Sequence, residues 1–317
     1  MFAALFALVL STMSVHFVSD EARAVLAILD LRAAKQPVPE VAWEKLFATE
    51  GYVRLKQREL SMHRAFDDST FRTFVMSDDL LARREQLATT LGDWLHADLQ
   101  HAAGLALAYL PANATIRATI YPVIKPAKNS FVFEHNAIFM YVEPIPREEF
   151  EATIAHEMHH IGYGTGCPKS DKPMPDNLKK LETWISAFGE GFATLAAAGG
   201  PDGIPQRKAT TRAEWEKEMA RFDENFATLT TFFQDVLDKK LQGDAADKRA
   251  FEFFGFVGPW YTVGYRMAVV IEKTLGRDAL IAATCDPHHF FATYNRAVRK
   301  SGERLPLWPE RLASAFD

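Results

Sequence analysis

The stretch Glu151-Ala-Thr-Ile-Ala-His156-Glu157-Met-His-His160-Ile-Gly-Tyr163 decides how the rest of this chain is interpreted. It contains the pattern His-Glu-x-x-His, in which His156 and His160 are four residues apart. Positions i and i+4 lie on one face of a helix, so two imidazoles there can bind one cation. Glu157 then lies beside the open coordination position, which in a catalytic zinc site holds water.

The apolar residues of this stretch predict a helix with two different faces. At about 100° per residue, His156 lies roughly 200° from Ile154, so the histidines point away from the apolar stripe. One face is then free to bind a metal while the other packs into a core. The alternative, two solvated histidines on a surface helix, remains open. The stripe recurs at i, i+4, i+8 and i+11 and consists of Phe150, Ile154, Met158 and Ile161.

A catalytic zinc usually has three protein ligands, and the best candidate for the third is Glu190. It lies between Gly189 and Gly191 in a small, apolar stretch, about 200° from Phe188 on a helical wheel. A buried carboxylate without a partner is costly, and a zinc ion is a sufficient partner. A hydrogen bond to the backbone or to an arginine is the alternative. The apolar stripe of this second helix is Ile185, Phe188, Phe192 and Leu195.

Length and composition indicate a soluble globular protein with a sizeable core. The 317 residues allow one large domain or two subdomains, and 48% of them are hydrophobic and 24% charged. The formal net charge is −5 and no long run of like charge occurs, so nucleic acid is not an expected partner.

The apolar run at residues 2–10 has the length of a signal peptide, but no Lys or Arg precedes it and no clear small-x-small cleavage site follows. The run is too short to span a bilayer, so stable membrane insertion is not expected. Localisation stays open, with export to the periplasm or medium slightly favoured over the cytoplasm.

The two cysteines, Cys167 and Cys285, provide no disulfide framework. They can pair only if the fold brings them together. We expect Cys167 to be a free, partly buried thiol rather than a metal ligand.

Periodicity and turn residues predict an α+β fold that is mostly helical. Short β-rich runs at 115–121, 129–133 and 137–142 predict a small sheet before the metal helix. We divide the chain into a signal-like or disordered N-terminus (1–18), an N-terminal helical region (19–110), the sheet with the zinc-binding helices as catalytic core (111–200), and a C-terminal helical subdomain (201–317).

The motif His156-Glu-x-x-His160 followed by Glu190-Gly-x-Ala resembles the gluzincins, zincin-like metallopeptidases whose zinc is bound by two His and a downstream Glu. The resemblance implies one Zn²⁺ per chain, bound by His156, His160 and Glu190. One departure is Thr194, at the place where thermolysin-like enzymes have an Asp that orients a histidine. Such an orienting partner must therefore come from elsewhere.

The chain is more closely similar to bacterial proteins described as zinc-dependent peptidases. Beyond the metal motifs, the similarity rests on Gly51-Tyr52, Asn129-Ser-Phe-Val-Phe133 and Tyr261-x-x-Gly-Tyr265-x-Met-Ala.

These observations predict a zinc metallopeptidase that acts on peptides or proteins. Glu157 is expected to take the proton of the zinc-bound water and pass it to the leaving amine. Tyr265, and next Tyr261, are the expected oxyanion donors, because they share the non-core face of one helix. One alternative is a zinc hydrolase acting on a non-peptide bond. The other is a zinc-binding protein without turnover, although structural zinc sites usually have four ligands, often Cys.

Overall fold

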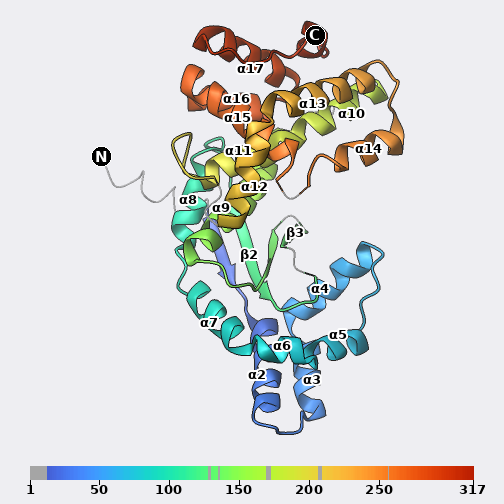
Figure 1. Ribbon diagram of the computed structural model, residues 1–317, viewed down its shortest axis with the longest axis vertical. Helices are drawn as coiled ribbons and strands as arrows, with labels where there is room; N and C mark the ends of the chain where they lie inside the picture. Colours follow the sequence, from blue (N-terminus) through green and yellow to red (C-terminus); the bar gives the residue numbers. More distant parts are fainter. Residues whose placement is uncertain (1–12, 128–129, 135, 169–172, 206–208, 256) are drawn as a thin grey trace, which may run out of the picture. The chain divides into compact units, whose positions relative to one another are not determined.

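The computed structural model describes residues 13–127, 130–134, 136–168, 173–205, 209–255 and 257–317. Within these ranges the protein is mostly helical with one small sheet, which confirms the predicted α+β class (Figure 1). The chain forms two compact units, residues 1–100 with 116–157 and residues 101–115 with 158–317. We call them unit 1 and unit 2. The four regions inferred from the sequence stay a prediction.

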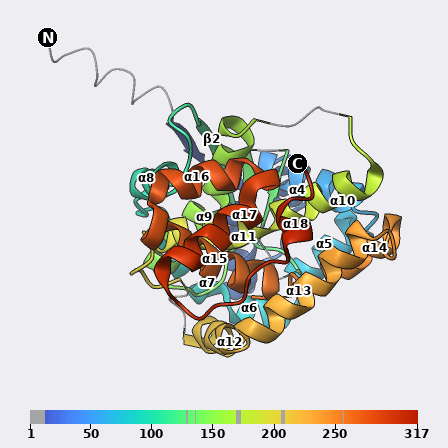
Figure 2. The same cartoon turned by 90° about the horizontal axis from the view of Figure 1, so that it is seen from above.

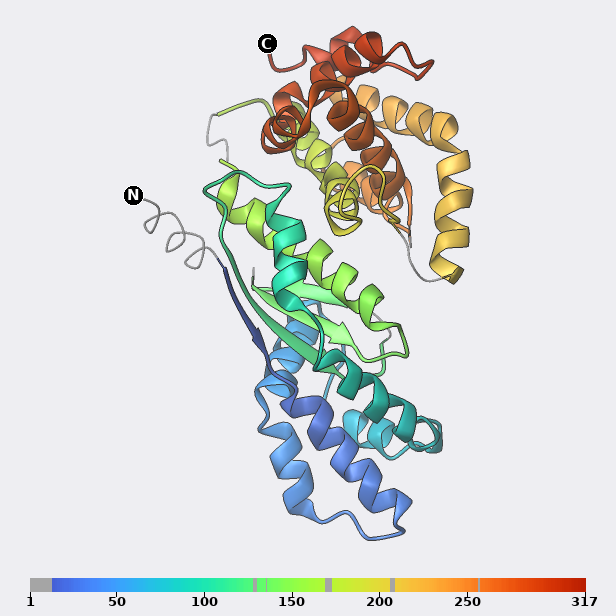
Figure 3. The ribbon, with the colours of Figure 1, turned by 90° about the vertical axis from the view of Figure 1, so that its left-hand side faces the viewer.

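Unit 1 contains a four-stranded sheet with the order β1-β2-β4-β3. The strands are β1 (Met13–Phe17), β2 (Ile116–Val123), β3 (Phe131–Phe133) and β4 (Ala137–Tyr141). Strands β1, β2 and β4 run parallel to one another, with Ile120 opposite Ile138, and β3 pairs antiparallel with β4 at the edge (Figure 3). Three of the strands correspond to the predicted β-rich runs, although Asn129 of the second run lies outside the described residues.

Short helices complete unit 1, and three of them begin at the capping residues Thr49, Asp67 and Ser77. Asp67 accepts a hydrogen bond from Thr70 N at 2.7 Å, and Ser77 accepts one from Leu80 N at 3.3 Å. The helices are α2 (Asp20–Ala33), α3 (Glu40–Phe47), α4 (Glu50–Ser61), α5 (Asp68–Val75), α6 (Asp78–Ala82) and α7 (Arg84–Trp94).

Unit 2 is helical and is built around α15 (Pro259–Leu275). This helix packs against α11 (Gly189–Ala197), α13 (Phe222–Leu237) and α17 (Pro287–Ser301), among others (Figure 2). Its apolar face is buried, with Val263, Met267 and Ile271 at 0% exposure. The other helices are α8 (Leu99–Leu107, which begins in unit 1), α10 (Asp176–Ile185), the 3₁₀ turn η1 (Ser186–Phe188), α12 (Ala209–Ala220), α14 (Gly243–Phe251), α16 (Arg277–Cys285) and α18 (Glu310–Ala313).

The cysteine prediction was wrong, because Cys167 and Cys285 form a disulfide in unit 2. The two residues are 118 positions apart, with their Cα atoms 4.9 Å from each other. Cys167 follows the metal helix directly and Cys285 ends α16. Nothing local in the sequence marks this pairing, since it depends on how distant helices pack.

Within the region 1–18, residues 13–17 form β1, which extends the sheet beside β2. Residues 1–12 lie outside the described part of the chain. No helix among the described residues is both long and apolar enough to cross a bilayer.

Candidate metal centre

Helix α9 (Arg147–Gly166) carries both histidines of the motif and has the two faces that the sequence predicts. Phe150, Ile154 and Met158 are fully buried, whereas His156 and His160 are half-buried, as is Glu157. The third histidine of the stretch, His159, is 1% exposed and therefore lies on the core side.

The start of α9 follows from the two prolines before it. Pro144 and Pro146 end the extended segment after β4, and the carbonyl of Pro146 accepts hydrogen bonds from Glu149 N and Phe150 N. The Phe150 ring stacks on Trp94 with centroids 4.3 Å apart. This contact anchors the first turn of α9 in the core of unit 1.

Helix α9 continues through Gly162 and Gly164 and ends at Gly166. Thr165 Oγ1 donates to Thr115 O at 2.7 Å, and a Cβ on Gly166 would lie 2.7 Å from the Cβ of Ala114. Close packing on the 101–115 segment of unit 2 therefore stabilises a turn that glycines alone would weaken.

Glu190 lies in the first turn of α11, which continues from α10 through the 3₁₀ turn. The predicted stripe of this helix is buried, with Phe188 and Leu195 at 0% and Ile185 at 2% exposure. The Glu190 side chain is 20% exposed. The hydroxyl of Thr194 donates to the main-chain carbonyl oxygen of Glu190 at 2.8 Å, so it forms a hydrogen bond with the helix backbone.

The three predicted ligands come together in the structure. One ligand atom each from His156, His160 and Glu190 lie within 4.8 Å of one another, and His160 Nε2 lies 3.4 Å from Glu190 Oε2. Zinc bonds of about 2.0–2.2 Å in a tetrahedron place neighbouring ligand atoms roughly 3.4 Å apart. The imidazole and carboxylate donors, and their spacing, therefore fit a zinc ion.

The two tyrosines predicted as oxyanion donors differ in accessibility. Tyr265 is 8% exposed, and its ring meets that of Trp215 edge-on with centroids 5.1 Å apart. Burial raises the pKa of the Tyr265 hydroxyl, and the charge of Asp202 adds to this effect. Tyr261, one turn earlier on α15, is half-buried. Tyr261 is thus the more accessible of the two.

Two further tyrosines of unit 2, Tyr294 and Tyr163, differ in burial. Tyr294 is fully buried and donates its hydroxyl proton to Pro306 O at 3.1 Å, so it is a core residue. Tyr163, three residues after His160, is half-buried; burial raises its pKa, which a hydrogen bond with Ser186 partly offsets.

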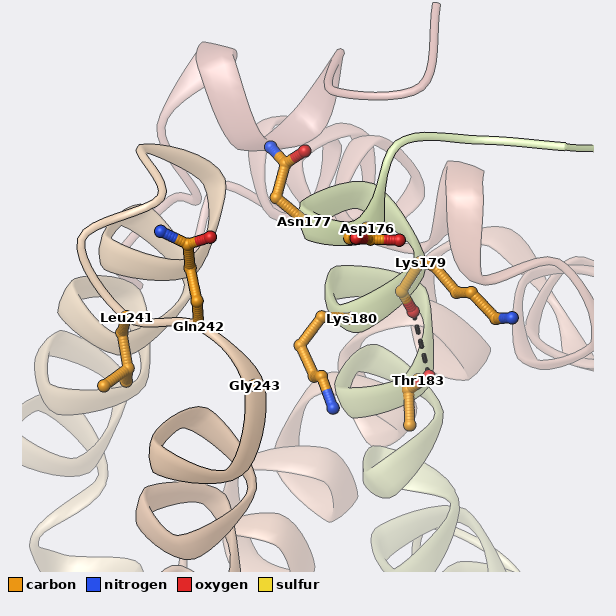
Figure 4. Close-up of a pocket in the computed structure, with 8 residues that line it drawn as sticks. All are labelled: Asp176, Asn177, Lys179, Lys180, Thr183, Leu241, Gln242 and Gly243. Carbon is orange, nitrogen blue, oxygen red and sulfur yellow. Dashed lines mark hydrogen bonds between the residues drawn. The ribbon is translucent and has the colours of Figure 1, made fainter.

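A pocket of about 580 Å³ lies elsewhere in unit 2, between α10 and the loop that joins α13 to α14 (Figure 4). Two of its polar side chains form bonds within the protein: Lys180 Nζ donates to both Asp247 oxygens, at 2.7 and 2.8 Å, and Asn177 Nδ2 donates to Leu237 O. The described residues that line it include none of the three candidate metal ligands. We assign it no chemistry. Its lining is Asp176, Asn177, Lys179, Lys180, Thr183, Leu241, Gln242 and Gly243.

The fold and the ligand group together define a mostly helical α+β protein with a three-residue site suited to zinc, two His from one helix and a Glu from a later one. Residues 43–303 match the family described as "Putative zinc dependent peptidase (DUF5700)", and the chain belongs to this family. A search of curated proteins and a search of solved structures each found no match.

Sequence reasoning did not indicate that another element packs closely against the glycine that follows Glu190, Gly191. In the structure that element is α15, and the contact is at Gly264 and Tyr265.

Proposed function

We propose that this protein is a gluzincin-type peptidase in which His156, His160 and Glu190 bind one zinc ion per chain. The observation that carries the proposal is the convergence of these three side chains, in a chain of the zinc-dependent peptidase family. Bound zinc would supply Lewis acidity toward water and toward the scissile carbonyl.

Glu157 is the general base and acid of the proposed reaction. It follows His156 on α9 and is half-buried, so it is close to the ligand group and open to solvent. Its carboxylate accepts a proton from the attacking water and delivers it to the leaving amine. A neighbouring tyrosine hydroxyl donates a hydrogen bond to the oxyanion, and we place the half-buried Tyr261 ahead of Tyr265 for this role.

An extended peptide is the proposed substrate. Strand β3 forms the edge of the sheet in unit 1 and runs antiparallel to β4. The free side of an edge strand can pair with an extended peptide through main-chain hydrogen bonds, and side-chain pockets then give specificity. Peptides with N-methylated amides on either side of the cleaved bond should therefore be poorer substrates than their parents. Equal kcat/KM for both would contradict the pairing with β3.

The test of the function compares Glu157→Gln with wild-type protein and with Glu148→Gln, a control at an exposed position in the first turn of α9. Zinc content is measured by mass spectrometry and cleavage by an unbiased peptide library. We expect Glu157→Gln to bind zinc normally and to lose at least about 10²-fold in kcat, with Glu148→Gln unchanged.

Two results would count against the proposal. Full activity of Glu157→Gln removes Glu157 from its assigned role. Zinc-loaded wild-type protein that cleaves no peptide in the library contradicts the peptidase function and favours a hydrolase of another bond or a zinc-binding protein.

We also propose that the protein functions outside the cytoplasm. The Cys167–Cys285 disulfide supports this location, because disulfides persist in oxidising compartments and are rare in the cytosol. Alkylation of thiols before cell lysis, followed by fractionation, tests the proposal. A cytosolic pool with both cysteines alkylated would contradict it.

A further inference from the structure

Helices α11 and α15 of unit 2 pack against each other (Figure 1). Their backbones touch at two glycines, Gly191 and Gly264. A Cβ added to Gly191 would lie 2.1 Å from Tyr265 N and 2.4 Å from Gly264 C. A Cβ added to Gly264 would lie 2.8 Å from Phe188 O. Both approaches are to backbone atoms, so a side-chain rotation cannot relieve them.

The helices on both sides of this crossing are fixed by the core. Four residues are at 0% exposure: Phe188 of η1, Leu195 of α11, and Val263 and Met267 of α15. Ordinary contact distances require the two helices to separate by roughly 1 Å if either glycine gains a methyl group. A close-packed core resists such a shift, and α11 is the shorter helix, so it is the element expected to move.

Glu190 immediately precedes Gly191, so movement of α11 moves the carboxylate. Metal sites tolerate distance changes of only about 0.2 Å. A shift of roughly 1 Å would therefore remove Glu190 Oε2 from its place 3.4 Å from His160 Nε2. Tyr261 and Tyr265 belong to α15, the other helix of this contact. The contact therefore also fixes the position of Glu190 relative to these two proposed oxyanion donors.

We propose that Gly191 and Gly264 are positioning residues that hold Glu190 at the metal, and that no residue larger than glycine serves at either place. The proposal rests on the role of Glu190 as a zinc ligand in the proposed function.

The chain supplies a matched control on the other side of Glu190. Gly189 also neighbours the ligand, its φ is −50°, and a Cβ there would meet nothing within 4 Å. Gly189→Ala and Gly191→Ala are therefore the same substitution, one residue before and one residue after the ligand, with opposite expected results. Leu229→Ala, which removes buried volume from the same core, is the control for a loss of stability alone.

The experiment measures zinc affinity by competition with a chelator, and the absorption spectrum of the Co²⁺-substituted protein. Gly191→Ala and Gly264→Ala should weaken zinc binding roughly 10- to 100-fold and change the Co²⁺ spectrum. Gly189→Ala and Leu229→Ala should keep the wild-type spectrum and an affinity within about twofold of wild type.

The outcomes separate this inference from the function on which it rests. Glu190→Gln with wild-type zinc affinity would refute Glu190 as a ligand. If Glu190→Gln loses zinc but Gly191→Ala and Gly264→Ala bind it as wild type does, the positioning role is refuted and the function stands. If neither glycine variant folds even with zinc present, the glycines serve folding alone, which also overturns the proposal.

Discussion

Removal of the Cys167–Cys285 disulfide should destabilise unit 2 strongly. The cross-link closes a segment in which the two cysteines are 118 positions apart. The chain-entropy relation gives a loss of about 5 kcal/mol for a loop of this length, as an upper limit. At about 2–4 °C per kcal/mol for a unit of this size, this corresponds to a decrease in Tm of roughly 10–20 °C. With an m-value of about 2 kcal/mol/M, the urea midpoint falls by roughly 2.5 M.

The assay is urea unfolding followed by tryptophan fluorescence, since Trp184, Trp215, Trp260 and Trp308 all belong to unit 2. The Cys167→Ala/Cys285→Ala double variant is compared with oxidised and with reduced wild-type protein. If the cross-link itself stabilises unit 2, reduced wild type and the double variant should unfold near the same midpoint, well below oxidised wild type. If reduced wild type and the double variant unfold at the same urea midpoint as oxidised wild type, the argument from chain entropy is refuted.

Three further predictions concern the oxyanion, pH and a helix cap. Tyr261→Phe should lower kcat by about 10²–10³ with zinc content unchanged, whereas Tyr265→Phe should reduce it less; steady-state kinetics that show the reverse order would restore Tyr265 as the donor. Burial raises the pKa of Glu21 from 4.5 to about 8. Between these pH values the folded protein keeps a proton on Glu21 that the unfolded chain has lost. The free energy of unfolding should therefore fall as the pH rises from about 4.5 to about 8. Urea titrations across that range should show a flatter pH dependence for Glu21→Gln; an unchanged profile would contradict this assignment. Asp67→Ala should cost about 1 kcal/mol of stability, because it removes the hydrogen bond to Thr70 N at the start of α5; an unaltered urea midpoint would argue against this cap.

The local elements of the site could be predicted because each depends on residues close together in the chain. The spacing of Phe150, Ile154 and Met158 alone indicates which face of α9 is buried, and the histidines then lie opposite. The same reasoning on α11 places Glu190 away from its core face, and the structure brings it to His160.

What sequence reasoning could not supply are the contacts between residues distant in the chain. Cys167 and Cys285 carry no local sign of their pairing, which follows from the packing of α9, α16 and their neighbours. Similarly, β1 is short and its role as a strand depends on β2, which supplies its hydrogen bonds about a hundred residues later. The partner of Gly191 is likewise a residue of a helix much further along the chain.

The interleaving of the two units has a consequence for synthesis and truncation. Residues 101–115 belong to unit 2 although they lie between the two segments of unit 1. During translation β1 emerges long before β2, so the sheet of unit 1 can begin to form only after residue 116 has left the ribosome. The segment 101–115 must wait still longer, until the chain from residue 158 onward is made. No single uninterrupted fragment corresponds to either unit, so a peptide of residues 158–317 lacks the segment on which Thr165 and Gly166 pack.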